Sequence, residues 1–254
     1  MTTRTIDLNA DAGEGFGAYT IGADAEMLRS VTSLNVACGF HAGDPVVIRG
    51  TIRAAKAAGV AVGAHPGFPD LQGVGRRPMH IAPDDLVAII VYQIGAVAAL
   101  AAAEGVRLRH VKAHGALYNM AVADDRLAGA IAEATAAFDG FCLFAPEGSA
   151  MAAAAASRGV RVASEAFLDR GYRADGTLTP RAEPGALVTD PARVAERAVM
   201  LARDGVVVAS DGARVALAPA PLCIHSDTPG AGRLAAAARG ALEAAGVRVA
   251  APMI

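Results

Sequence analysis

A short junction recurs along this chain: a helical pattern ends at a glycine, and a valine-rich segment follows at once. It occurs at Gly59-Val60, Gly105-Val106, Gly159-Val160, Gly205-Val206 and Gly246-Val247. Glycine is favoured just after a helix because it adopts left-handed backbone angles without steric cost. Repeated short connections from helix to strand predict a mainly parallel sheet that is covered by helices.

The spacing of apolar residues predicts where these elements lie. Helices are expected over 44–58, 82–104, 124–138, 149–158, 190–204 and 229–245, with a short one over 24–30. Strands are expected near 5–9, 33–38, 60–64, 108–113, 141–145, 161–166 and 221–225. Segments 206–210 and 214–217 flank Asp211-Gly212, which is typical of a hairpin turn. We therefore expect one α/β domain over residues 1–254, with about seven parallel strands in a barrel; an open doubly wound sheet is the alternative.

Composition narrows the classes of partner. The net charge of the chain is −2 and it has no basic run, so we expect neither nucleic acid nor a membrane as a partner. The N-terminal sequence lacks the apolar core of a signal peptide, and the alanine-rich runs at 94–103 and 150–156 are too short or interrupted to span a bilayer. The three cysteines lie far apart and form no CxxC pair, which favours a cytoplasmic protein without structural zinc.

Four of the six histidines lie just past an apolar strand pattern: His41, His65, His114 and His225. Parallel strands bring their carboxyl ends to one rim, where α/β proteins place their chemistry. We expect His41, His65 and His114 to share that rim with Asp11 and Glu14, which follow the first strand. Imidazoles beside carboxylates suit proton transfer and a divalent metal equally well. His80 and His110 are interpreted as structural.

Known motifs account for little of this pattern. Asp7-x-Asn9-x-Asp11 resembles the start of a calcium loop, but Ala12 and Ala18 stand where that loop needs Gly and Glu. The sequence contains no Walker phosphate loop, no dinucleotide-binding fingerprint and no GxSxG nucleophile elbow. The sequence therefore contains none of the common motifs for binding a nucleotide phosphate or for a serine nucleophile.

Lys112 and His114 are two residues apart, so a strand would point both side chains to the same face. In a barrel, Lys112 would lie deeper and His114 at the mouth. A buried ammonium needs a partner, and Asp7 is the carboxylate we expect to pair with Lys112. Two irregular segments, 67–81 and 169–184, are candidate substrate loops. Arg170, in the second of them, is a candidate for binding an anion.

Six segments of the chain resemble the LamB/YcsF family, the prokaryotic proteins that form the A subunit of 5-oxoprolinase. They are DLNADAGEGFG at 7–17, NVACGFHAGDP at 35–45, GAHPGFPD at 63–70, HGALYN at 114–119, EAFLDRGY at 165–172 and HSDTPGA at 225–231. The resemblance implies a seven-stranded α/β barrel related to glycoside hydrolases and deacetylases. It also implies ATP-driven opening of 5-oxo-L-proline to L-glutamate, with Mg²⁺ accompanying ATP, in a complex with 5-oxoprolinase subunits B and C.

Under that activity the site needs a base for water, cations for phosphate and a grip on the substrate carboxylate. Catalytic roles are expected for Asp11, Glu14, His41, His65, Lys112 and His114. Substrate-binding roles are expected for Asp7, Asn9, Asn35, Tyr118, Arg170 and His225. No residue is assigned to a metal. Two alternatives stay open: a metal-dependent deacetylase or amidohydrolase using Asp7, His41, His65 and His114, and a non-catalytic binding protein whose partner carries the chemistry.

Overall fold

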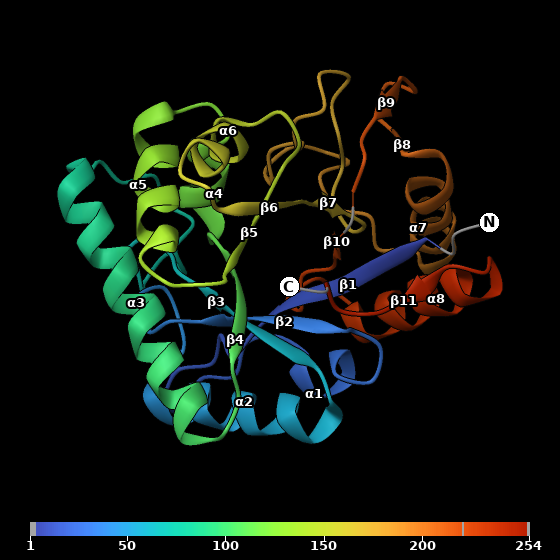
Figure 1. The fold of residues 1–254 in the computed structure, drawn as a ribbon. Coiled ribbons are helices and arrows are strands. Elements are labelled where there is room, and N and C mark those ends of the chain that lie inside the picture. Colours follow the sequence, from blue (N-terminus) through green and yellow to red (C-terminus); the bar gives the residue numbers. More distant parts are fainter. Residues whose placement is uncertain (1–3, 220, 253–254) are drawn as a thin grey trace.

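A ring of parallel strands lies at the centre of the protein, and helices surround it (Figure 1). The computed structural model describes residues 4–219 and 221–252. The strands of the main sheet are β1 (Thr5–Ala12), β2 (Ser33–Ala37), β3 (Ala61–His65), β4 (Leu108–Lys112), β5 (Cys142–Ala145), β6 (Arg161–Ser164), β7 (Ala166–Phe167), β10 (Pro221–Cys223) and β11 (Arg248–Val249).

The sheet is a nearly closed barrel, as predicted. Its strand order is β6-β5-β4-β3-β2-β1-β10-β7, and neighbouring strands are parallel. The two edge strands β6 and β7 are separated in the chain by Glu165 alone. The N–H of Glu165 donates to Ala145 on β5, and the N–H of Leu168 donates to Cys223 on β10, both at 2.9 Å. One continuous segment thus borders both edges, so seven chain segments form the ring.

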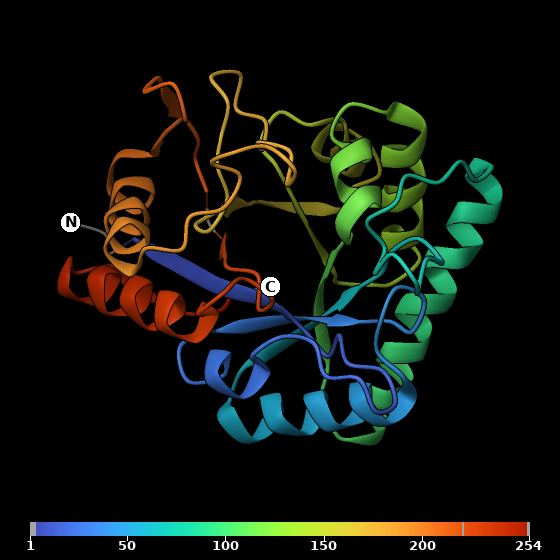
Figure 2. The same cartoon turned by 180° about the vertical axis from the view of Figure 1, so that it is seen from behind.

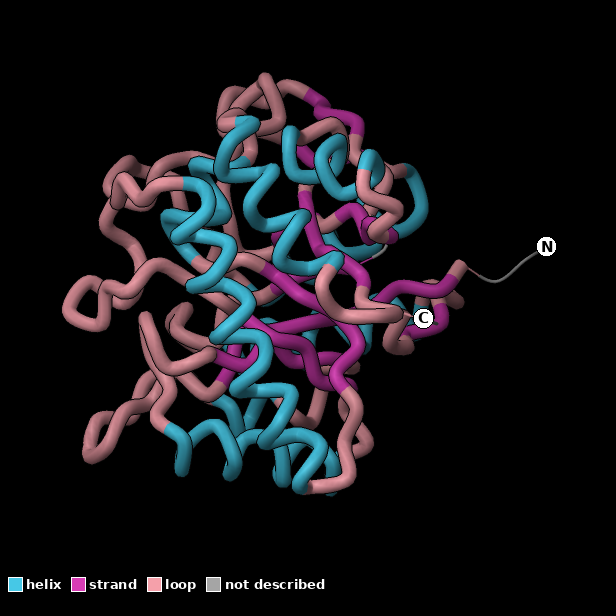
Figure 3. Tube along the Cα trace, turned by 60° about the vertical axis from the view of Figure 1, so that its left-hand side comes forward, coloured by secondary structure: helices cyan, strands magenta, loops and turns pink. Residues whose placement is uncertain are grey.

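Helices form the outer layer, as Figure 2 shows from behind and Figure 3 shows with helices in cyan around strands in magenta. They are α1 (Asp24–Met27), α2 (Pro45–Ala58), α3 (Pro83–Ala103), α4 (Gly115–Ala121), α5 (Asp125–Ala136), α6 (Ala150–Ser157), α7 (Pro191–Asp204) and α8 (Ala231–Ala244). The predicted helices are confirmed, although α1 is shorter than expected. The predicted hairpin is also confirmed: β8 (Val206–Val208) pairs antiparallel with β9 (Arg214–Ala216).

Helix ends explain why the chain turns where it does. The Asp44 carboxylate accepts hydrogen bonds from the backbone N–H groups of Val46 and Val47, which caps α2 at its start. Gly59 ends the same helix with a φ of 69°, the left-handed conformation that its sequence position predicted. The cap fixes how β2 passes into α2, and therefore where the intervening loop holds His41.

Helix α3 is long and apolar enough, by length and composition, to cross a membrane, with a mean hydropathy of 2.3. In this structure 33% of that apolar window is buried inside the protein. The helix packs against α2, α5 and β3, with Leu86, Ile90 and Ile94 fully buried. The buried third of the helix is the face that packs against these neighbours.

The interior of the barrel is polar on its β1 side. Side chains alternate along a strand, so Asp7, Asn9 and Asp11 share one face of β1. Lys112 on β4 contacts Asp11 on β1, although two strands separate β4 from β1 in the sheet. Such a contact can only cross the barrel interior. Gly63 on β3 makes room for a further polar residue, because a Cβ there would lie 2.3 Å from the His110 ring.

Candidate functional site

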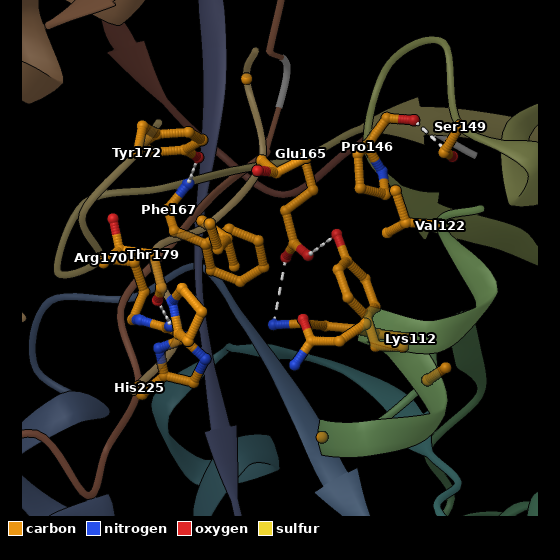
Figure 4. A pocket seen from close by; sticks show the side chains of 18 of the residues that line it. Lys112, Val122, Pro146, Ser149, Glu165, Phe167, Arg170, Tyr172, Thr179 and His225 are labelled. Atoms are coloured by element: carbon orange, nitrogen blue, oxygen red, sulfur yellow. Dashed lines mark hydrogen bonds and ion pairs between the residues drawn. The ribbon is translucent and has the colours of Figure 1, made fainter. Parts of the chain in front are cut away.

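One cavity of about 760 Å³ opens at the carboxyl ends of the strands. Its walls come from the ends of β1, β3 and β4, the start of α4, and the segment that follows Glu165. Part of the predicted substrate loop, residues 175–181, covers one side. Figure 4 shows Lys112 and Glu165 pointing toward each other in this cavity, with His225 beside Arg170. Of the predicted site residues, the cavity walls include Asp11, His65, Lys112, His114, Tyr118, Arg170 and His225.

Lys112 is a buried ammonium between two carboxylates. Its Nζ lies 3.0 Å from Asp11 Oδ1 and 3.2 Å from Glu165 Oε1. The ring of Phe167 lies below it, with 5.1 Å between Nζ and the ring centroid. Burial by itself would lower the pKa of Lys112, but Asp11 and the other neighbouring groups hold that pKa well above its usual value. Lys112 therefore stays charged, as expected.

The expected pairing of Lys112 with Asp7 is wrong. The Asp7 carboxylate accepts hydrogen bonds from Thr32 and Ser33, each at 2.6 Å, one layer deeper in the barrel. Both residues were assigned correctly to the interior, but Asp11, four residues further along β1, lies at the height of the ammonium. Burial raises the pKa of Asp7 to about 7, against the effect of its two hydrogen bonds.

The predicted group of histidines and carboxylates does meet at one rim. His65 Nε2 lies 3.3 Å from Asp11 Oδ2 and 2.9 Å from His114 Nδ1. Glu14 Oε1 lies 3.3 Å from His114 Nδ1 and 3.5 Å from His41 Nε2. The His41 and His114 rings stack, with centroids 3.8 Å apart. The shared position of these five side chains is confirmed; their catalytic roles stay predictions.

At neutral pH the surroundings keep the Asp11 carboxylate charged and leave the His41 and His114 imidazoles neutral. Burial opposes ionisation of Asp11, but His65 and Lys112 overcome that effect and hold its pKa well below the usual range. Burial lowers the pKa of His41 and of His114 well below the ordinary histidine value. Both rings are therefore neutral at pH 7; each keeps a lone pair that can bind a cation, and the lowered pKa makes each a weak base.

A second imidazole site was only partly found from the sequence. His225 Nδ1 lies 3.1 Å from both carboxylate oxygens of Asp169, which is fully buried. The hydroxyl of Thr228 donates to the same carboxylate at 2.6 Å. Burial raises the pKa of Asp169, but His225 and Thr228 outweigh burial and lower it overall. The carboxylate thus orients His225 so that Nε2 faces the cavity, 3.9 Å from Asp11 Oδ2.

Glu165 and Asp169 were missed, although both belong to the segment EAFLDRGY that carried the family resemblance. They straddle Phe167 at spacing two, so they share a strand face with it, and that alternation was the available signal. Tyr118, which was predicted, donates its hydroxyl to Glu165 Oε2 at 3.1 Å. Arg170 donates to the carbonyls of Thr179 and Ala186, so two of its five N–H groups hold the loop.

Three predicted substrate-binding residues lie behind the cavity wall. Asn35 donates to Asn9 Oδ1 and to Asp11 Oδ1, each at 2.8 Å, and His110 lies 2.8 Å from the Asn35 oxygen. Among the described residues, Asp7, Asn9 and Asn35 do not line the cavity. The geometry therefore favours a role in positioning Asp11 for Asn35 and Asn9, rather than contact with substrate.

Comparison with known proteins gives this arrangement a context. The family model described as LamB/YcsF matches residues 6–253. The chain belongs to the LamB/YcsF family. It is 54% identical to the 5-oxoprolinase A subunit of Symbiobacterium thermophilum over 98% of this chain and 96% of that protein, and 51% identical to the one from Heliobacterium modesticaldum over 96% of each.

The chain is also similar to a solved structure. The crystal structure of a lactam utilization protein from Thermus thermophilus matches 98% of this chain and 100% of its own, with a TM-score of 0.93 and 50% identity. The family predicted from the six segments is therefore confirmed, and so is its barrel fold.

Proposed function

We propose that this protein is the A subunit of an ATP-dependent 5-oxoprolinase, which opens 5-oxo-L-proline to L-glutamate with conversion of ATP to ADP and phosphate. The observation that carries the proposal is the buried Lys112 ammonium between Asp11 and Glu165, with imidazoles on two sides, at the wall of one cavity. The proposal draws its substrate from relatives, which are named as the A subunit of 5-oxoprolinase and as a lactam utilization protein.

The chemistry of a lactam explains why ATP and these groups are needed together. A lactam is an amide, and its carbonyl carbon is a poor electrophile. Transfer of the γ-phosphoryl group of ATP to the amide oxygen releases ADP and makes the carbonyl carbon a far better electrophile. Water adds to that carbon, and the C–N bond breaks as a proton passes to the nitrogen, which leaves an acyl phosphate. A second water hydrolyses the acyl phosphate to the carboxylate of glutamate and phosphate. The site must hold the substrate carboxylate, neutralise charge on phosphate and remove a proton from water.

The residues of the cavity match these tasks. Lys112 and Arg76 are cations on its wall, and Arg76 pairs with Asp227 at 2.5 Å. His225, oriented by Asp169, can take a proton from water at Nε2. The cavity volume of about 760 Å³ exceeds what a five-membered lactam fills, which leaves room for a phosphate donor.

Partners and location belong to the same proposal. The name of an A subunit implies a larger complex, and we propose that subunits B and C complete the enzyme and contribute to the binding of ATP with Mg²⁺. We propose a cytoplasmic location, where ATP is available. The three cysteines, Cys38, Cys142 and Cys223, are free and buried, as a reducing compartment allows.

The test is reconstitution. This protein is mixed with subunits B and C, 5-oxoproline, ATP and Mg²⁺, and glutamate and phosphate are measured. We expect one glutamate and one phosphate for each lactam, and no glutamate when this protein is left out. Activity on an acetylated sugar with none on 5-oxoproline would instead support the deacetylase alternative. Full turnover after substitution of every rim histidine would show that the partners carry the chemistry.

A further inference from the structure

We infer that Asp11, His65 and His114 form a binding site for one divalent transition-metal ion at the cavity wall. Their ligand atoms would be Asp11 Oδ2, His65 Nε2 and His114 Nδ1. The site belongs to the protein itself and can be tested with no substrate present. It is distinct from the Mg²⁺ that accompanies ATP, because Mg²⁺ prefers oxygen ligands and the phosphates of its nucleotide.

The backbone fixes which nitrogen of each ring carries hydrogen. His65 Nδ1 lies 2.7 Å from the carbonyl oxygen of Lys112, and His114 Nε2 lies 2.8 Å from that of Val74. A carbonyl only accepts, so both of these nitrogens must donate. In the neutral rings, His65 Nε2 and His114 Nδ1 are then bare lone pairs. Imidazoles that bind metals are held by this same kind of hydrogen bond from the other nitrogen.

The two lone pairs point at each other and at carboxylates. His65 Nε2 faces His114 Nδ1 at 2.9 Å and Asp11 Oδ2 at 3.3 Å, and His114 Nδ1 faces Glu14 Oε1 at 3.3 Å. Four acceptors that converge without a hydrogen between them repel one another. A proton on one ring or a cation at their centre removes the repulsion, and titration with a metal ion distinguishes the two.

Asp11 is prepared for the same task. Its Oδ1 accepts hydrogen bonds from Asn35 at 2.8 Å and from Lys112 at 3.0 Å. Those bonds fix the carboxylate plane and leave Oδ2 directed at His65. His65 Nε2 lies 3.3 Å from Asp11 Oδ2 and 2.9 Å from His114 Nδ1. Both distances are close to the separation between two ligand atoms of a tetrahedral metal site. That separation is about 3.3 Å for metal–ligand bonds of about 2.0 Å.

Glu14 and His41 lie beside the site, and with His114 they also bring ligand atoms within 4.8 Å of one another. Within residues 4–219 and 221–252, the two ring nitrogens of His41 and the Oε1 atom of Glu14 have no hydrogen-bond partner. Both residues are at least 98% buried. Val74 supplies the carbonyl for His114 with a φ of 50°, which is strained for a β-branched residue. Such strain persists where the surroundings require it, and here it aims an oxygen at a ligand ring.

A rival site is less well prepared. Asp11, Cys223 and His225 also bring ligand atoms within 4.8 Å of one another. However, Cys223 Sγ already lies 3.0 Å from the Lys112 ammonium, and His225 Nε2 lies 3.9 Å from Asp11 Oδ2. A cation beside the ammonium would be repelled, so the ion belongs on the His65 side of Asp11.

The ligands limit the kind of ion and its use. Two imidazoles and one carboxylate suit Zn²⁺, Co²⁺, Fe²⁺ or Mn²⁺. All three side chains line the cavity, so the remaining coordination position faces the space where substrate would bind. An ion there can polarise a carbonyl oxygen or activate a water molecule.

The experiment uses cobalt as a spectroscopic probe. The full-length protein is treated with chelator, dialysed and titrated with CoCl₂ while visible absorption is recorded. We expect d–d bands that saturate at one Co²⁺ per chain and disappear when Zn²⁺ is added. His65→Gln and His114→Gln should each weaken binding by about 10²-fold or more. His80→Gln, an exposed histidine outside the cavity, should bind as the wild type does.

Folding and ligand identity are checked separately. Far-ultraviolet circular dichroism and thermal melting in chelator show whether each variant is folded. X-ray absorption of the Zn²⁺-loaded wild type needs no variant, and should show nitrogen and oxygen ligands with two imidazoles. A sulfur ligand, no saturable cobalt spectrum, or wild-type affinity in folded His65→Gln would each overturn the site. None of these readouts depends on whether the protein turns over 5-oxoproline.

Discussion

The two imidazole sites on either side of Lys112 are built differently. On one side, backbone carbonyls hold His65 and His114 so that their free nitrogens converge. On the other, the carboxylate of Asp169 holds His225, and Nε2 of that ring faces the cavity. A carbonyl fixes the orientation of a ring without adding charge. A carboxylate also stabilises the imidazolium that forms when the ring takes a proton.

This difference assigns different tasks to the same residue type. The carbonyl-held rings are suited to bind a cation, and the carboxylate-held ring is suited to carry a proton. Lys112 lies between the two sites, and Asp11 faces both, with His65 at 3.3 Å and His225 at 3.9 Å. Removal of Lys112, a change to the carboxylate behind His225, and a test of whether the two sites act independently each probe this division of tasks.

Removal of Lys112 has the largest expected effect. Lys112→Met leaves Asp11 and Glu165 buried without their cation, which should destabilise the fold by about 3–5 kcal/mol. Turnover by the reconstituted enzyme should fall by about 10²-fold or more. Lys56→Met is the matched control, because Lys56 is exposed on α2. Urea unfolding and glutamate production measure both effects, and a stable, active Lys112→Met protein would contradict the central position of this ammonium.

A smaller change tests the carboxylate behind His225. Asp169→Asn keeps the shape but removes the charge, and its amide can donate to Nδ1 and turn the other nitrogen into the protonated one. We expect turnover to fall by about 10²-fold, with a changed pH profile of kcat. Asp204→Asn, at the exposed end of α7, is the control. An unchanged pH profile would remove the proton-carrying role from His225.

Asp7, which lies one layer deeper in the barrel than Asp11, should affect the stability of the fold and not turnover. Its pKa is about 7 in the folded protein and near the ordinary 3.8 in the unfolded chain. Between these values the folded state holds a proton that the unfolded state has lost, so stability falls as pH rises through the window. The loss is at most about 4 kcal/mol. Asp7→Asn should flatten the dependence of the unfolding free energy on pH between about 4 and 7. If the variant shows the same pH dependence as the wild type, Asp7 is not its cause.

The sequence predicted what depends on local periodicity. The long helices, the glycine ends and the single rim for His41, His65 and His114 follow from patterns within each segment. Helix α4 was missed because it is short, begins at Gly115 and has no side-chain cap. Strand β11 was not predicted as a separate strand, and it has only two residues.

Contacts between side chains on opposite sides of the barrel could not be predicted from patterns within single segments. Lys112 and Asp7 do share the interior, but their relative heights depend on how far neighbouring strands are offset along the ring. That offset places Asp11, rather than Asp7, beside the ammonium. The alternation in Asp7-x-Asn9-x-Asp11 places all three side chains on one face of β1, but it does not tell which of them lies level with Lys112.

The most direct test of whether both imidazole sites serve one reaction is a double-mutant cycle. Turnover is measured for His114→Ala, Asp169→Asn and the double variant in the reconstituted complex. Groups that act as a unit lose their effects together, so we expect the double variant to be about as slow as the slower single variant, about 10²-fold below wild type. Losses that multiply, to about 10⁴-fold, would show two independent contributions and contradict a single shared active site.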